Sequence, residues 1–177
     1  MTHKLENPAR VEELSPAETL RRIGLKDGDA FCDIGAGTGI FAFAAAQQTH
    51  TDVYAVEISR QMLDILEEKK QALGAANVVI KDGVQHVPSA SCQVALLCTV
   101  LHELHDAQNV LGEIKRVLEK CGVLAVIEFH KRVTGMGPPP ELRLSPEQTE
   151  RLLEPYGFRK TGYFELGGNL YALLFSA

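Results

Sequence analysis

The chain has 177 residues, of which 45% are hydrophobic and 23% are charged, and this composition suits one globular domain with a full core. The formal net charge of −5 excludes a global basic field that would collect nucleic acid. A local basic patch stays open as an alternative.

The start of the chain and its cysteines bear on its location. The opening MTHKLENPAR is polar and lacks the apolar core of a signal peptide. The longest apolar run, near residues 94–101, has the length of a strand and not of a membrane span. We interpret Cys32, Cys98 and Cys121, in or beside expected buried strands, as core thiols. We therefore expect a cytoplasmic protein without a membrane partner.

Residues 2–29 form an arm before the first expected strand. NPARVEEL indicates a short helical turn. The following Ser15-Pro16-Ala17-Glu18 begins a second helix, with an N-cap residue, a proline at the first helical position and an early acid. That helix turns Leu20 and Ile23 inward and ends near Gly24.

The stretch FCDIGAGTGIF, residues 31–41, predicts a strand that turns sharply through glycines into a helix near Thr38. Gly35, Gly37 and Gly39 lack a Cβ atom, so the chain is free to adopt positive φ and a ligand can lie directly on the backbone. The turn leads into a helix N-terminus, which favours an anionic group. In open α/β sheets, cofactors bind at this place.

The spacing of the glycines separates two cofactor classes. The dinucleotide fingerprint G-x-G-x-x-G would put its third glycine at Ile40, but here it comes one residue earlier. Asp33 precedes the first glycine by two residues. The pattern D-x-G-x-G-x-G resembles motif I of the class I S-adenosylmethionine (SAM)-dependent methyltransferases. The resemblance implies that the turn contacts the methionine part of SAM and that Asp33 holds its amino group. A similar turn in another Rossmann-like protein is the alternative.

The second βα unit adds an acid at the end of its strand. A helix is expected over residues 38–48, and the run from Asp52 to Glu57 is rich in β-forming residues. Glu57 is placed to accept hydrogen bonds from both ribose hydroxyls of a nucleoside cofactor, and a solvated carboxylate is the alternative. Ile58 follows and is expected to pack on the adenine. A helix then runs over residues 60–73, with Met62 on its apolar side.

The third strand, residues 77–80, is followed by Lys81-Asp82-Gly83. The resemblance implies that Asp82 binds the adenine amino group, while an Asx turn with Gly83 is a compatible structural reading. Val84 is expected to wall the same pocket.

A fourth strand over residues 93–99 leads into VLHELHD, which resembles the hxxHELxD segment of small-molecule methyltransferases. The two histidines, His102 and His105, are too close for the H-E-x-x-H zinc motif, so no metal is expected. An imidazole titrates near neutral pH, which makes His102 a candidate general base. The alternative is that His102 caps the cofactor pocket or binds a backbone carbonyl.

The last third of the chain continues the alternation of strands and helices. A helix is expected over residues 107–120 and a fifth strand over residues 123–129, after which His130 is a second candidate for substrate contact. The glycine- and proline-rich residues 131–144 predict a stiff loop that serves as a lid or as a connector. A capped helix begins at Ser145, and residues 158–166 and 169–176 form a hairpin.

The resemblance covers residues 30–176 and implies an α/β fold, a Rossmann-like three-layer sandwich. Its sheet has seven mostly parallel strands in the order 3-2-1-4-5-7-6, with an antiparallel last strand. We expect one methyltransferase domain over residues 1–177, made of a helical arm (1–29) and a core (30–177). In resembling proteins such an arm often folds over the cofactor and helps to shape the substrate site, and a simple packing helix is the alternative.

The function that the resemblance implies is methyl transfer from SAM to a small-molecule acceptor by in-line displacement, with S-adenosylhomocysteine as product. The catalytic candidates are His102 and His130. The implied cofactor-binding residues are Asp33, Gly35, Ala36, Gly37, Thr38, Gly39, Glu57, Ile58, Met62, Asp82, Gly83, Val84 and Thr99. A non-catalytic SAM-binding module is one alternative. An NAD-dependent oxidoreductase is another, which the early third glycine disfavours.

Overall fold

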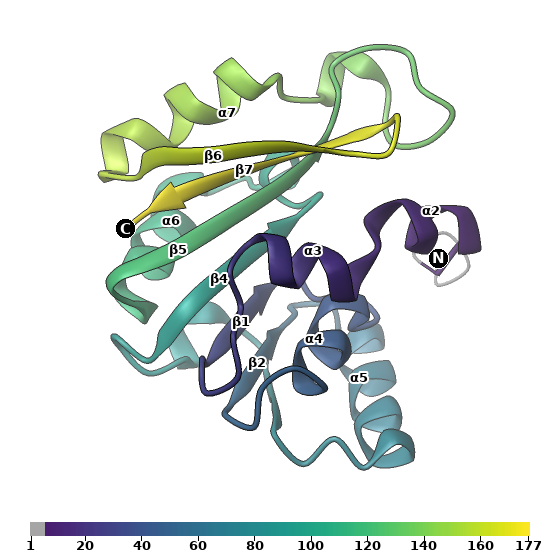
Figure 1. The fold of residues 1–177 in the computed structure, drawn as a ribbon, viewed down its shortest axis with the longest axis vertical. Coiled ribbons are helices and arrows are strands. Elements are labelled where there is room, and N and C mark those ends of the chain that lie inside the picture. Colours follow the sequence, from purple (N-terminus) through teal and green to yellow (C-terminus); the bar gives the residue numbers. More distant parts are fainter. Residues whose placement is uncertain (1–5) are drawn as a thin grey trace.

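The computed structural model describes residues 6–177, so the polar residues 1–5 at the start of the chain lie outside the description. A seven-stranded sheet with the order β3-β2-β1-β4-β5-β7-β6 runs through the molecule (Figure 1). Strands β1 to β5 pair in parallel, whereas β7 pairs antiparallel with β5 on one side and β6 on the other. The predicted fold class and strand order are confirmed.

The strands are β1 (Phe31–Ile34), β2 (Val53–Val56), β3 (Val78–Lys81), β4 (Cys92–Cys98), β5 (Leu118–Phe129), β6 (Arg159–Leu166) and β7 (Leu170–Ser176). The α-helices are α2 (Pro8–Leu14), α3 (Pro16–Arg22), α4 (Ile40–Ala46), α5 (Arg60–Leu73), α6 (Ala107–Val117) and α7 (Pro146–Leu153). Short 3₁₀ turns are η1 (Val84–His86), η2 (Leu101–Glu103), η3 (Pro140–Leu142) and η4 (Glu154–Tyr156). Within residues 6–177, no helix has the length and apolarity that crossing a membrane requires.

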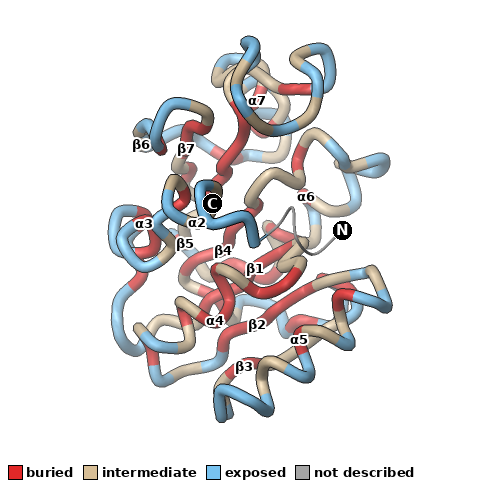
Figure 2. Tube along the Cα trace, turned by 90° about the vertical axis from the view of Figure 1, so that its right-hand side faces the viewer, coloured by how far each residue is buried: buried red, intermediate tan, exposed pale blue. Residues whose placement is uncertain are grey.

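The two faces of the sheet bury two separate apolar clusters, because successive strand residues point to opposite sides. In β1, Phe31 belongs to the cluster that α3, α4 and α5 cover. Cys32 and Ile34 belong to the other cluster, which α6 and α7 cover. Figure 2 shows buried stretches concentrated in the central strands and exposed stretches on the outer helices and turns. The sheet is therefore the middle layer of three.

The parallel strands bring their carboxyl ends to one edge. Ile34 at the end of β1 pairs with Val56 in β2 and with Leu97 in β4, so the loops that follow these strands emerge side by side. Helix α2 lies on the side toward which β4 and β5 point (Figure 1). This edge is where the fold places a ligand.

Two expectations about the centre of the chain are wrong. The helix predicted over residues 107–120 ends at Val117, and β5 begins at Leu118 instead of Val123. Leu118 extends the sheet by pairing with Cys92, past an irregularity in the register of β4. Cys92, at the start of this pairing, is a buried thiol. Cys121 was expected to be a core thiol, but it is exposed and has a left-handed φ of 70°, so this expectation is wrong as well.

Candidate functional site

A cavity of about 510 Å³ opens at the carboxyl ends of the central strands, within the size range of small-molecule sites. The predicted cofactor-binding residues that line it are Asp33, Gly35, Ala36, Gly37, Thr38, Glu57, Ile58, Met62, Gly83, Val84 and Thr99. These residues come from loops far apart in the sequence. The parallel sheet brings them together.

The glycine turn after β1 adopts the backbone that the sequence predicts. Gly35, Gly37 and Gly39 have φ angles of 75°, 56° and 83°, in the left-handed region that favours glycine. Gly39 does not line the cavity. A Cβ atom there would lie 2.5 Å from Phe43 and 2.7 Å from Leu66, so this glycine lets α4 and α5 pack closely. In this turn, Gly35 and Gly37 present their backbone to the cavity, whereas Gly39 packs against α4 and α5.

The hydroxyl oxygen of Thr38 is buried and has no hydrogen-bond partner within residues 6–177. Leaving a buried polar atom unpaired costs about 1–3 kcal/mol. Thr38 lines the cavity and is itself only 2% exposed. A ligand atom at this place would satisfy the hydroxyl, so the unpaired oxygen marks the turn as a binding surface.

Glu57 ties the loop after β2 to the glycine turn. Its Oε2 accepts a hydrogen bond from the backbone N–H of Gly37 at 2.8 Å. Its Oε1 accepts from the N–H groups of Ile58 at 2.8 Å and Ser59 at 2.9 Å. An ionised carboxylate has about four lone-pair sites, so acceptor capacity remains for a ligand hydroxyl.

Asp33 forms the buried acidic floor of the cavity. Its side chain is held by one hydrogen bond, from the backbone N–H of Ala42 to Oδ2 at 3.0 Å. Burial raises the pKa of Asp33 to about 7, the bond from Ala42 opposes this, and the charge of nearby Glu57 adds to the rise. A cationic ligand group beside Asp33 would stabilise the ionised carboxylate.

Asp82 does not line the cavity, although its neighbours Gly83 and Val84 do. Its Oδ1 lies 2.6 Å from His86 Nδ1, and this hydrogen bond holds the pKa of Asp82 below its ordinary value. The carboxylate faces a neighbouring hollow of about 470 Å³. The structure therefore does not bring Asp82 together with the other predicted residues.

His102 does not line the cavity either, and its side chain is 5% exposed. Its Nδ1 lies 2.7 Å from Oε2 of Glu128, a carboxylate that is fully buried, and its backbone N–H donates to the other oxygen at 3.2 Å. Burial acts to lower the pKa of His102, but the hydrogen bond and the charge of Glu128 outweigh it and raise the pKa. The Nδ1 partner is thus a carboxylate and not the backbone carbonyl that was one alternative, and Nε2 lies 3.6 Å from Oε1 of Glu103.

His130 lies on the hairpin side of the molecule, outside the cavity lining. Its Nε2 is 2.6 Å from Oε2 of Glu165, and its ring packs on Tyr171 with the centroids 5.4 Å apart. The structure therefore does not support substrate contact at this residue.

The loop over residues 131–144 is held together from within by Arg143, which is 3% exposed. The guanidinium donates hydrogen bonds to four backbone carbonyl oxygens at 2.6–3.0 Å, those of His130, Arg132, Met136 and Pro138. No residue of the loop lines the cavity. The loop is therefore a hydrogen-bonded connector outside the cavity lining, and the structure gives no support for a lid.

Sequence patterns did not identify a further group of lining residues. It comprises Arg10 and Leu14 from α2, together with Cys98, Val100, Glu103, Leu104, Asn109 and Val110. Arg10 donates from Nη2 to the hydroxyl of Thr99 at 3.2 Å. In the sequence Arg10 belongs to the N-terminal arm, for which the resemblance implied a place over the cofactor, but no pattern singles out this residue.

Comparison with known families and structures gives consistent results. A family model described as a methyltransferase domain matches residues 32–126. A SAM-dependent methyltransferase from Aquifex aeolicus superposes with a TM-score of 0.91 at 28% identity, covering 98% of this chain and 95% of that one. The [4+2]-cyclase SpnF has a TM-score of 0.78 at 19% identity, covering 93% of this chain and 80% of that one, which shows the fold alone.

Curated relatives also match this chain. The ubiquinone/menaquinone biosynthesis C-methyltransferase UbiE of Cupriavidus pinatubonensis is 24% identical over 88% of this chain and 77% of that protein. The demethylmenaquinone methyltransferase of Tropheryma whipplei is 28% identical over 62% of this chain and 45% of that protein.

Proposed function

This chain belongs to the methyltransferase domain family of the class I SAM-dependent superfamily, and on that premise we propose that it methylates a small-molecule acceptor. The observation that carries the proposal is the cavity, where the glycine turn, the unpaired Thr38 hydroxyl and two carboxylates meet. We further propose that residues 1–177 act as one domain, with residues 1–29 as an arm on the core.

The lining residues fit SAM as cofactor. Asp33 offers a buried carboxylate to the amino group, Glu57 retains acceptor capacity for ribose hydroxyls, and Thr38 has an unsatisfied hydroxyl. Ile58 and Val84 supply apolar contact for the base. The remaining residues proposed to touch the cofactor are Gly35, Ala36, Gly37, Met62, Gly83 and Thr99. Bound there, SAM supplies a methyl group activated by a sulfonium leaving group.

The contribution of the protein is alignment and exclusion of water. The far side of the cavity is walled by apolar side chains, among them Leu14, Leu104 and Val110. Such walls hold the acceptor in one orientation and keep water away from the reacting atoms. Alignment alone supplies roughly 7–11 kcal/mol in favourable cases. Because neither His102 nor His130 lines the cavity, the proposal needs no histidine base.

We propose the hydroquinone class as the first acceptor to test. Support comes from the names of the relatives, which refer to ubiquinone and menaquinone biosynthesis and to demethylmenaquinone. The apolar walls formed by Leu104 and Val110 suit a ring of this kind. Ring carbon would then be the acceptor atom.

The proposal is tested first by binding and then by turnover. Calorimetry with SAM, S-adenosylhomocysteine and NAD should show binding of the first two only. Incubation with SAM and a panel of acceptors that includes reduced quinones should release S-adenosylhomocysteine, with boiled protein as the control. Binding of NAD in preference to SAM would contradict the cofactor assignment. Tight SAM binding without product across a broad panel would favour a non-catalytic module.

A further inference from the structure

The cavity has an uneven distribution of charge. Three acids line it, Asp33, Glu57 and Glu103, whereas Arg10 is the only lysine, arginine or histidine among the residues of 6–177 that line it. A ligand that carries both signs of charge therefore meets several carboxylates and a single cation. Any anionic group of the ligand is most favourably placed beside Arg10.

Arg10 lies at the cavity because packing and hydrogen bonds hold α2 in place. Leu14 at its end is fully buried in the core, and Ser15, with a φ of 40°, forms the bend into α3. Glu13 accepts hydrogen bonds from the backbone and side chain of Asn169, at 2.7 Å from the backbone N–H. These contacts join α2 to the hairpin turn between β6 and β7.

A second fastening joins the start of α2 to the glycine turn. Lys69 of α5 forms an ion pair with Glu6, just before the helix. The same ammonium donates to the carbonyl oxygen of Thr38 at 3.0 Å. The arm that carries Arg10 is thus attached to the turn on which a ligand would lie.

The sheet order indicates which part of the cofactor lies near Arg10. Strands lie about 4.8 Å apart, in the order β3, β2, β1, β4 across this edge. In the proposed function the base lies at Val84 after β3 and the ribose at Glu57 after β2. The amino-acid tail then extends over Asp33 of β1 toward Thr99, the residue to which Arg10 is hydrogen-bonded.

We propose that Arg10 binds the carboxylate of the amino-acid tail of SAM. The inference rests on the proposed function and names a residue of that same site. A guanidinium matches a carboxylate with two parallel N–H donors. The bond to the Thr99 hydroxyl holds the group in place before the ligand arrives, which reduces the entropy lost on binding.

The test removes one charge from each partner. The ligands are S-adenosylhomocysteine and 5′-deoxy-5′-(3-aminopropylthio)adenosine, which lacks only the carboxylate. Calorimetry on Arg10→Met should show affinity for S-adenosylhomocysteine lowered by about 10–100-fold, the scale of a charged hydrogen bond. Affinity for the analogue should stay within about threefold of that of the unaltered protein.

Two further variants serve as controls. Arg21→Met makes the same substitution in α3, where the side chain is 61% exposed and pairs with Glu18, and it should leave both affinities unchanged. Arg10→Lys keeps the charge but loses the paired donors and should fall between the unaltered protein and Arg10→Met. Melting curves without ligand verify that each variant folds.

Several outcomes overturn the inference. An equal loss for both ligands would make Arg10 a structural residue of α2. An unchanged affinity for S-adenosylhomocysteine, with a raised KM for an acceptor that bears a carboxylate, would assign Arg10 to the acceptor. If the unaltered protein binds neither nucleoside, the proposed function fails as well, so the two failures are distinguishable.

Discussion

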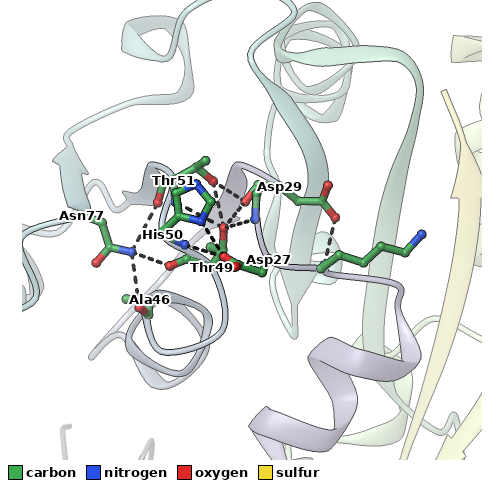
Figure 3. A network of polar contacts seen from close by, with 9 residues as sticks. Asp27, Asp29, Ala46, Thr49, His50, Thr51 and Asn77 are labelled. Carbon is green, nitrogen blue, oxygen red and sulfur yellow. Dashed lines mark hydrogen bonds and ion pairs between the residues drawn. The ribbon is translucent and has the colours of Figure 1, made fainter.

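The two ends of the parallel sheet differ in how completely their polar groups are hydrogen-bonded. At the amino ends, Asn77 donates from its side-chain nitrogen to the carbonyl oxygens of Ala46, Thr49 and Thr51 (Figure 3). The hydroxyls of Thr49 and Thr51 both donate to the backbone carbonyl oxygen of Asp29. The loops there satisfy one another. At the carboxyl ends, the buried hydroxyl of Thr38 has no hydrogen-bond partner in the part of the chain that the structure describes, and burial raises the pKa of Asp33.

This difference separates a structural edge from a binding edge. A complete network stabilises the fold and has nothing to gain from a ligand. An incomplete one leaves a cost in the free protein that a ligand with matching groups removes. If this reading is correct, matched substitutions at the two ends should affect stability alike and ligand affinity differently.

The largest effect on affinity is expected for Gly37→Val. A branched residue is strained at a φ of 56°, and its side chain would occupy the space where the cofactor meets the backbone. We expect affinity for S-adenosylhomocysteine to fall by more than about 100-fold in calorimetry. The control is Gly28→Val at the amino end, where φ is 93° and a Cβ atom would approach His50 only to 3.9 Å. Normal binding by the Gly37 variant would move the site to another loop.

The second-largest effect on affinity is expected for Glu57→Ala. It removes an acceptor of the ribose together with three hydrogen bonds from backbone N–H groups, so affinity should fall by about 1–3 kcal/mol and the melting temperature should also drop. Asn77→Ala is the matched control, because it breaks a comparable set of bonds at the amino end. The control should lose stability and keep its affinity. An unchanged affinity in the Glu57 variant would remove this residue from the ribose.

Asp33→Asn should weaken binding by about tenfold, since an amide cannot pair with the ligand ammonium. It should also stabilise the free protein at neutral and alkaline pH, because a buried charge disappears. The expected readouts are a lower affinity in calorimetry and a higher melting temperature at pH 8. A variant that is both weaker in binding and less stable at pH 8 would contradict the view of Asp33 as a strained binding group.

The effect of Asp33 on the stability of the fold should depend on pH. The pKa of about 7 in the folded protein exceeds the ordinary value of 3.8, so the folded state binds more protons than the unfolded state between these two values. The contribution of Asp33 to stability therefore decreases as pH rises from about 4 to about 7. The difference in melting temperature between the unaltered protein and Asp33→Asn should change in that window.

The smallest effect on affinity is expected for His102→Gln, because this side chain lies outside the cavity. Its raised pKa means that pairing with Glu128 stabilises the fold below the unfolded pKa near 6.5, and this stabilisation is lost as pH rises through the folded pKa. The stability lost on substitution should thus be larger at pH 6 than at pH 9 by thermal unfolding. A tenfold loss of S-adenosylhomocysteine affinity would place His102 in the binding site after all.

The sequence predicted well where the signal was local. The glycine turn and the acid at the end of β2 are each contained in a few adjacent residues, and both line the cavity. The period of two in the strands placed alternate residues in two different clusters. Predictions were less accurate for Asp82 and Cys121, because a neighbouring histidine and an early start of β5 set the environment of these side chains.

By itself, then, the sequence indicated the alternation of strands and helices and the glycine turn, because hydrophobic periodicity and glycine geometry act over short stretches. The fold class and the strand order were implied by the resemblance of the glycine pattern to a known family, and the structure confirms both. Only the tertiary structure placed Arg10 against Thr99, a residue 89 positions away, and buried His102 against Glu128, 26 positions away. Neither contact leaves a periodic trace in the chain. The first exists because α2 lies at the cavity beside the end of β4, and the second because β4 and β5 are neighbouring parallel strands whose ends the sequence keeps apart.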